Sequence, residues 1–196
     1  MTNNDVRLCI AVLLTILALI VLPPSTRAEP SCTGYLNGSV LRPLSQPVAM
    51  SLAPSAAADP NPALVQRFLD GVWKTGISTV LDGSENTILD LSFSVRDPGA
   101  GAPGPASGTY KGFNWLVGQP APSGSGQTIR GTTVLMTAEA IDAASQSLGW
   151  VGSLRCTVQV NDGGALAEDL GEVIGRSLGK SLKDERFGDR ESSVRF

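Results

Sequence analysis

Residues 87–95 read TILDLSFSV, a stretch in which apolar and polar side chains alternate. Asp90, Ser92 and Ser94 occupy the polar positions, and leucine, phenylalanine and valine occupy the others. Successive side chains of an extended strand point to opposite faces of a sheet. The pattern therefore predicts a half-buried strand, with its apolar side against a core and its polar side in solvent.

Three further segments have the composition of strands. Val48, Met50 and Leu52 alternate with small residues and predict a short first strand. Residues 132–142 and 150–160 flank a turn at 143–149 and predict a hairpin. Cys156 has the same phase as the inward apolar residues of the second arm. We therefore expect a mixed sheet of about four strands.

Two segments have the period of an amphipathic helix. The first, residues 62–74, follows Asn61 as a capping residue, has Pro62 at its first position and stops at Gly76. The second, residues 165–182, carries an apolar stripe and a stripe of small residues every fourth position. We expect both helices to pack on one face of the sheet. The small stripe consists of Ala167, Gly171, Gly175 and Gly179.

The predicted fold is α+β, an α/β two-layer arrangement in the order β-α-β-(Gly/Pro-rich insertion)-β-β-α. One α/β domain is expected over residues 46–182, with the Gly/Pro-rich insertion at 97–128. Residues 29–45 are expected to form an irregular lead-in. Residues 183–196 are rich in charge and are expected to form a disordered tail.

The N-terminal 28 residues have the features of an export signal. Residues 8–22 contain no charge, and Pro23 and Pro24 follow directly. A run of fifteen uncharged, mostly apolar residues is short for a membrane span, which needs about 20, but it suits a cleaved signal peptide. We therefore expect a periplasmic or secreted protein. The alternative is an uncleaved anchor that holds the protein at the inner membrane through residues 8–22.

The charge balance argues against nucleic acid as a partner. Removal of residues 1–28 leaves 13 basic and 17 acidic side chains, a net charge of −4. The basic residues are scattered along the sequence and form no stripe. A mildly acidic protein repels phosphate backbones and anionic lipid, so any membrane contact is expected only through an uncleaved N-terminal segment.

Two cysteines remain after export, Cys32 and Cys156. An even pair in an oxidising compartment predicts a disulfide, which would contribute about 4 to 5 kcal/mol through the long loop that it closes. One alternative leaves Cys156 as a buried thiol and Cys32 free. Another makes Cys32 the acylated cysteine of a lipoprotein.

Residues 175–181 read GRSLGKS and superficially match two catalytic motifs. A nucleophile elbow needs a strand that ends at the serine and a histidine base, yet Ser177 falls within a predicted helix and the chain has no histidine. A phosphate-binding loop needs a glycine where Ile174 stands. Acidic residues are dispersed. We therefore assign no catalytic, cofactor-binding or metal-binding residues and expect no cofactor.

The aromatic residues Tyr110, Phe113 and Trp115 lie close together between two Gly/Pro-rich stretches. Exposed rings at such a place could contact a glycan, a lipid interface or a protein partner. Alternatively, the segment forms an extra strand or plug whose rings return to the core.

Residues 140–152, AIDAASQSLGWVG, and residues 166–179, LAEDLGEVIGRSLG, carry a family resemblance. With Asp142 before the turn and Trp150 and Gly152 after it, residues 46–182 resemble small bacterial periplasmic (lipo)proteins. These proteins are related to the α/β domain found at the amino terminus of Tol-system proteins and in curli-secretion proteins. The resemblance implies a mostly non-enzymatic envelope component and assigns no functional residue.

The sequence thus predicts an exported, non-enzymatic envelope protein that binds a partner or takes part in an assembly in the periplasm. The partner would be an envelope protein or a glycan. A periplasmic enzyme with a carboxylate-based site and an N-terminally membrane-anchored binding protein are the two alternatives.

Overall fold

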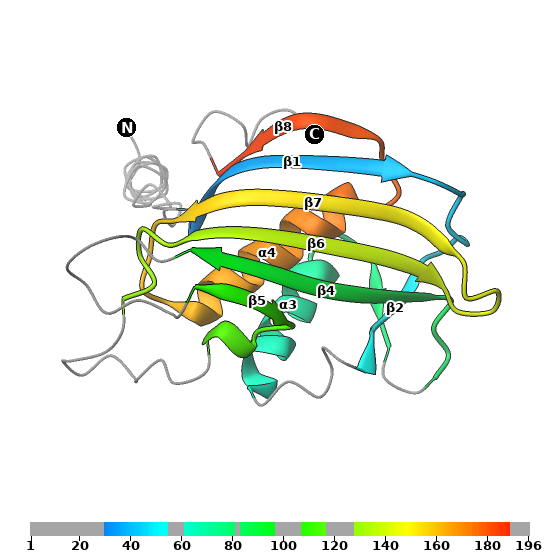
Figure 1. Cartoon of the computed structure of the whole chain (residues 1–196). Coiled ribbons are helices and arrows are strands. Elements are labelled where there is room, and N and C mark those ends of the chain that lie inside the picture. The colour runs from blue at the N-terminus through cyan, green and yellow to red at the C-terminus, as the bar shows by residue number, and fades with distance from the viewer. Residues whose placement is uncertain (1–29, 55–60, 81–82, 97–106, 117–127, 189–196) are drawn as a thin grey trace, which may run out of the picture.

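The computed structural model describes residues 30–54, 61–80, 83–96, 107–116 and 128–188. Two α-helices, one short 3-10 helix and eight strands make up the described part (Figure 1). In chain order they are β1 (Cys32–Val40), β2 (Ala49–Leu52), α3 (Pro62–Trp73), β3 (Ser78–Thr79), β4 (Thr87–Arg96), β5 (Gly108–Lys111), η1 (Asn114–Leu116), β6 (Thr133–Asp142), β7 (Leu148–Val158), α4 (Gly163–Ser177) and β8 (Leu182–Phe187).

All eight strands belong to one mixed sheet with the order β3-β2-β4-β6-β7-β1-β8. β5 lies outside this path and pairs with the second half of β4. β2 runs parallel to β3 and β4, and the other neighbouring pairs are antiparallel. The predicted sheet of about four strands is therefore wrong, because β1, β3 and β8 were not anticipated and β5 was foreseen only as one of two interpretations of the aromatic segment.

β1 occupies most of the segment that was expected to be an irregular lead-in. It pairs with β7 from Cys32 to Val40, although glycine and asparagine are poor strand formers. The contacts across the sheet explain its glycines. A Cβ at Gly34 would lie 2.0 Å from the carbonyl oxygen of Arg155, and one at Gly38 would lie 2.7 Å from the carbonyl oxygen of Lys180 and 3.2 Å from Nε1 of Trp150. Close approach by neighbouring groups, which a strand glycine permits, thus accounts for the composition.

The C-terminal part of the chain also differs from the prediction. α4 ends at Ser177 rather than continuing to residue 182, and Gly179 reverses the chain with a φ of 74°. The indole of Trp150 donates a hydrogen bond of 2.9 Å to the carbonyl of Lys180 and so holds this turn. β8 then pairs with β1 at the edge of the sheet. Its charged residues suit an edge strand, where they discourage pairing with other chains. Residues 189–196 of the expected tail lie outside the described residues.

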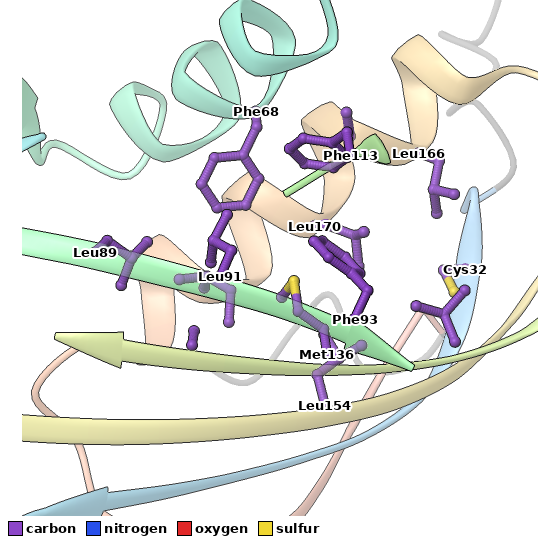
Figure 2. Packing of buried hydrophobic residues seen from close by; sticks show 14 of the residues in the cluster. Cys32, Phe68, Leu89, Leu91, Phe93, Phe113, Met136, Leu154, Leu166 and Leu170 are labelled. Atoms are coloured by element: carbon purple, nitrogen blue, oxygen red, sulfur yellow. The ribbon is translucent and has the colours of Figure 1, made fainter. Parts of the chain in front are cut away.

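The hydrophobic core lies between the sheet and the two helices, which cover the same face (Figure 1). Figure 2 shows Phe68 of α3 and Leu170 of α4 above the inward side chains of the central strands. The alternating pattern of β4 is confirmed, because Leu89, Leu91 and Phe93 are fully buried.

Gly171 of the small-residue stripe packs against α3 and not against the sheet, whereas Gly179 lies beyond the end of α4 and has Leu44 as its neighbour. A Cβ at Gly171 would lie 2.0 Å from the carbonyl oxygen of Phe68, and one at Gly71 of α3 would lie 2.0 Å from that of Glu168. The two helix backbones are therefore in direct contact. On the exposed side of this contact, Glu168 accepts hydrogen bonds from Lys74 and, at 3.1 Å, from Arg67.

The predicted disulfide is confirmed. Cys32 and Cys156 are bonded, with their Cα atoms 5.8 Å apart, and they join β1 to β7. Because the sulfur of Cys32 is engaged in this bond, the interpretation of Cys32 as an acylated cysteine is wrong. Disulfides persist in oxidising compartments, so the bond fits an exported protein. Within the described residues, no helix is both long and apolar enough to span a bilayer. The expected signal peptide, residues 1–28, lies outside them.

Candidate binding face

The face of the sheet that points away from α3 and α4 carries no helix in the described part of the chain (Figure 1). We call the outward side chains of the four central strands the outer face. They alternate with the buried residues of each strand. The outer face consists of Thr33, Tyr35, Asn37 and Ser39 of β1, Val151, Ser153, Arg155 and Thr157 of β7, Thr133, Leu135, Thr137, Glu139 and Ile141 of β6, and Ile88, Asp90, Ser92, Ser94 and Arg96 of β4.

One cross-strand row of the outer face combines aromatic, cationic and apolar groups. Tyr35 pairs with Arg155 on one side and with Arg186 of β8 on the other, and Arg155 pairs with Leu135. We call these four residues the Arg–Tyr row. Tyr35 is 48% exposed and Leu135 is 44% exposed.

The guanidinium of Arg186 stacks on the ring of Tyr35, with its Cζ atom 5.6 Å from the ring centroid. Such a cation–π contact contributes about 0.5 to 1 kcal/mol at an exposed site. The contact restricts both side chains. A guanidinium is therefore held beside the exposed phenol before any ligand arrives.

Register gathers basic residues that are far apart in the sequence. Arg96 lies at the end of β4, in the row next to that of Arg155, so the two residues and Arg186 share one end of the outer face. Toward the other end Asp90 and Glu139 are cross-strand partners, and beyond them Ile88 pairs with Ile141. Asp90 is bound by Lys111 of β5 at 2.9 Å. The expectation of scattered basic residues holds for the sequence but not for the folded surface.

Serine and threonine fill most of the remaining outer face. Hydroxyl groups both donate and accept hydrogen bonds, and neighbouring strands present them about 4.8 Å apart. The surface is therefore an open sheet lined mainly by hydroxyl groups, with basic residues at one end and acidic and then apolar residues toward the other. It can hold an extended ligand, but it encloses no reacting group in the way that a catalytic cleft does.

The aromatic residues expected to contact a partner lie elsewhere. Phe113 and Trp115 are buried against Phe93, with ring centroids 5.3 and 6.0 Å from it. Tyr110 of β5 is partly buried against the same core. The segment returns to the core, as the second interpretation of these rings proposed. Phe113 and Trp115 therefore present no ring surface to a partner.

Asp142, which carries part of the family resemblance, organises a turn. Its carboxylate accepts hydrogen bonds from the backbone N–H and the hydroxyl of Ser145 at 2.8 and 2.7 Å, and from the hydroxyl of Ser45 at 3.4 Å. These bonds, that of the Ser145 backbone first, hold the pKa of Asp142 below its usual value. Gly152 leaves room for the ring of Trp150, because a Cβ there would lie 2.2 Å from it. Asp142, Trp150 and Gly152 therefore have structural roles, in holding a turn and in accommodating an aromatic ring.

The GRSLGKS segment has no catalytic geometry. Ser177 is buried, and its hydroxyl donates to the carbonyl of Ile174 at 2.9 Å. Beside this segment lies an open groove of about 450 Å³, with Arg176 and Lys180 among its lining residues. In the described part of the chain, histidine, cysteine and acidic residues form no cluster of three that could hold a metal ion.

The sequence did not predict that these residues come together on the outer face, and the reason is specific. The pattern of β7 placed Arg155 on its outward side, but Tyr35 and Arg186 fell in segments that were expected to be irregular. Only the register of β1 against β7 and β8 brings these residues together. No local signal in the sequence reports such a register.

Comparison with known proteins identifies no family. No protein-family model matches the chain. No curated protein matches it either.

Several solved structures are similar in shape. A PelC dodecamer from Paraburkholderia phytofirmans matches with 11% identity and a TM-score of 0.42, over 76% of this chain and 99% of PelC. A single-residue variant of that dodecamer matches with 13% identity and a TM-score of 0.43, over 74% of this chain and 97% of the variant. A PDZ domain protein from Parabacteroides distasonis matches with 9% identity and a TM-score of 0.46, over 79% of this chain. This chain spans 37% of that PDZ domain protein.

Likenesses at this level carry no conclusion about function. None of the comparisons tests the resemblance to Tol-system and curli-secretion proteins, which stays a prediction.

Proposed function

We propose that this chain is an exported, non-catalytic envelope protein that binds a partner through the outer face of its sheet. One observation carries the proposal. Tyr35 and Leu135 stay about half exposed on the two strands that flank Arg155, as its cross-strand partners, on the face that no described helix covers. Tyrosine and arginine are enriched among the residues that dominate binding energies at protein interfaces.

The support for this face is rigid. Tyr35 and Arg155 stand on directly paired strands, and the disulfide between Cys32 and Cys156 joins the same two strands on the core side. Binding groups held on strands lose little freedom when a ligand arrives, so more of the contact energy appears as affinity. The disulfide therefore supports the binding surface as well as the fold.

Site-specific photo-crosslinking tests the proposal. A benzophenone amino acid replaces Leu135 on the outer face in one variant. In a matched control it replaces Trp73, an apolar residue of α3 that is 66% exposed on the helix layer. Both variants are irradiated in the native envelope of the producing cells.

We expect a discrete adduct, or a high-mass one, from position 135 and none of comparable yield from position 73. Equal yields at both positions would indicate random collisions. Adducts only at position 73 would place the binding surface on the helix layer and contradict the proposal.

A further inference from the structure

We infer that the outer face binds a second copy of this chain, and that the two copies pack sheet against sheet about a two-fold axis that runs across the strands. The inference rests on the proposed function and names the partner. The axis passes through the row of Ser153 and Thr137, which are cross-strand partners at the middle of the face. Each copy then lays the basic rows of its face on the acidic and apolar rows of the other.

The charge of the outer face changes sign along the strands. Arg155 lies one row to one side of Ser153, and Glu139 lies one row to the other side of Thr137, the partner of Ser153. Both charged side chains are exposed, and neither forms an ion pair with another described residue. The cation and the anion therefore stand at equal distances from the proposed axis. A two-fold interface requires this arrangement, because each residue must meet its complement on the other copy.

The change of sign also decides how the two copies are oriented. With the axis across the strands, the row of Arg155 faces the row of Glu139 in the second copy, so the charged contact forms twice. With the axis along the strands, each row would face its own copy, and the two Arg155 side chains would lie in facing rows. Like charges that face one another disfavour such a complex. Charge complementarity therefore selects the axis across the strands.

Apolar side chains near the middle of the face fit the same arrangement. Leu135 is 44% exposed and is the cross-strand partner of Arg155, while Val151 is the cross-strand partner of Glu139. The axis that joins these two rows brings Leu135 close to Val151 of the second copy. Their contact removes apolar surface from water, a favourable contribution that does not depend on charge.

The apolar pair at the far end of the face also gains a cover. Ile88 and Ile141 are cross-strand partners two rows beyond the axis, and Arg96 lies two rows away on the other side. The axis therefore places Arg96 over Ile88 of the second copy. The methylene groups of an arginine can cover an apolar surface while the guanidinium stays in water.

The size of the face indicates a weak dimer. β1 is nine residues long, and strands about 4.8 Å apart with about 3.4 Å per residue give the four central strands a face of roughly 600 Å². Two copies would bury about 1,200 Å², which is the lower end of the range for specific interfaces. We therefore expect monomers in dilute solution and dimers as the concentration rises.

Sedimentation velocity on the purified exported protein tests the inference, from about 1 μM to about 1 mM. Arg155→Glu reverses one charge of the contact. The double variant Arg155→Glu/Glu139→Arg restores the contact with its signs exchanged. Arg42→Glu is the matched control, because it makes the same change of net charge at an exposed position beyond the end of β1. Thermal melting verifies that each variant is folded.

We expect the mass of the wild type to rise from that of one chain to that of two. Arg155→Glu should weaken the dimer by about tenfold or more, because two attractive contacts become repulsive. The double variant should return to within about threefold of the wild type, and Arg42→Glu should change the dimer by less than about twofold. If Arg155→Glu does not fold, Glu139→Arg alone produces the same repulsion from the other side.

Single cysteines test the orientation of the two copies. A bismaleimide linker of about 10 Å matches the spacing of packed sheets, and the native cysteines are bonded to each other and do not react. Ser153 lies on the axis opposite its own copy, whereas the two copies of Thr157 would be about 27 Å apart along the strands. We expect linked dimers from Ser153→Cys and none from Thr157→Cys. Linked dimers from Thr157→Cys would overturn the proposed axis.

The remaining outcomes separate this inference from the proposed function. A chain that stays monomeric up to about 1 mM, with adducts at position 135 to a different protein, would overturn the second copy as the partner but leave the proposed function standing. Loss of crosslinking at position 135 as well would overturn both. Equal weakening by Arg155→Glu and Arg42→Glu would reduce the association to net charge, and failure of the double variant to recover would overturn the contact between Arg155 and Glu139.

Discussion

Gly171→Ala adds one methyl group at the contact between α4 and α3. The new Cβ would lie 2.0 Å from the carbonyl oxygen of Phe68, whereas contacts below 3.0 Å are essentially never seen for real Cβ atoms. The oxygen belongs to the backbone of α3 and cannot rotate away. The two helices must therefore separate by about 1 Å, and this separation loosens the core beneath them.

Two opposing terms set the magnitude of the effect. Overpacking of this kind costs about 1 to 3 kcal/mol, and a backbone clash belongs at the upper end. Replacing glycine by alanine inside a helix gains about 1 kcal/mol. We expect a net loss of about 2 kcal/mol in the free energy of unfolding, which corresponds to a fall of roughly 4 to 8 °C in Tm.

Thermal melting followed by circular dichroism measures this loss. Gly163→Ala is the matched control, because its Cβ would meet nothing closer than 3.6 Å, the distance to Leu116. We expect that variant to stay within about 0.5 kcal/mol of the wild type. A Gly171→Ala variant that melts at or above the wild-type temperature would refute direct contact between the helix backbones.

Three other predictions concern the disulfide, the turn after α4 and the charged contact between the helices. Replacing both half-cystines by serine should lower the free energy of unfolding by about 4 to 5 kcal/mol in urea titrations; a change below about 1 kcal/mol would contradict an intact disulfide. Trp150→Phe removes the hydrogen bond to the carbonyl of Lys180 and should increase amide exchange in β8 more than in β4. Glu168 has its pKa held below the ordinary value of 4.5 by its hydrogen bond to Lys74. Its stabilising effect is therefore present at neutral pH and is lost as the pH falls through its lowered pKa, so Glu168→Gln should be less stable than the wild type at pH 7 but not at acid pH.

The elements that periodicity predicted correctly are those whose pattern is complete within the segment. α3 extends from Pro62 to Trp73, within one residue of its expected range. β4 has its expected alternation of buried and half-buried positions. In such segments one face is apolar throughout, so the local pattern already contains the information about burial.

The two missed strands at one edge of the sheet, β1 and β8, lack such a pattern. β1 contains Gly34 and Gly38, whose positions are explained by neighbouring groups on β7 and beyond, not by strand propensity. β8 is mostly charged, as an edge strand often is. Their pairing depends on contacts with distant parts of the chain, which a single sequence does not display.

The glycine stripe of α4 shows how far a pattern can be interpreted. Its spacing correctly indicated close backbone approach on one side of the helix. It did not identify the neighbour, which is α3 rather than the sheet, because Gly171 meets Phe68. Prediction of the candidate binding face has the same limit. The predicted strand over residues 150–160 placed Arg155 on its outward side, but Tyr35 and Arg186 lay in segments for which no strand, and so no pairing with a neighbour, was predicted.

Oxidative footprinting in the native envelope tests most directly whether the outer face is the binding surface. Hydroxyl radicals label exposed tyrosine and tryptophan, and Tyr35 and Trp73 are 48% and 66% exposed on opposite layers of the protein. Labelling is compared between the purified protein and the protein in intact cells. The account predicts that Tyr35 is protected in cells while Trp73 is labelled as in the purified protein. Equal labelling of Tyr35 in both settings, or protection of Trp73 alone, would contradict it.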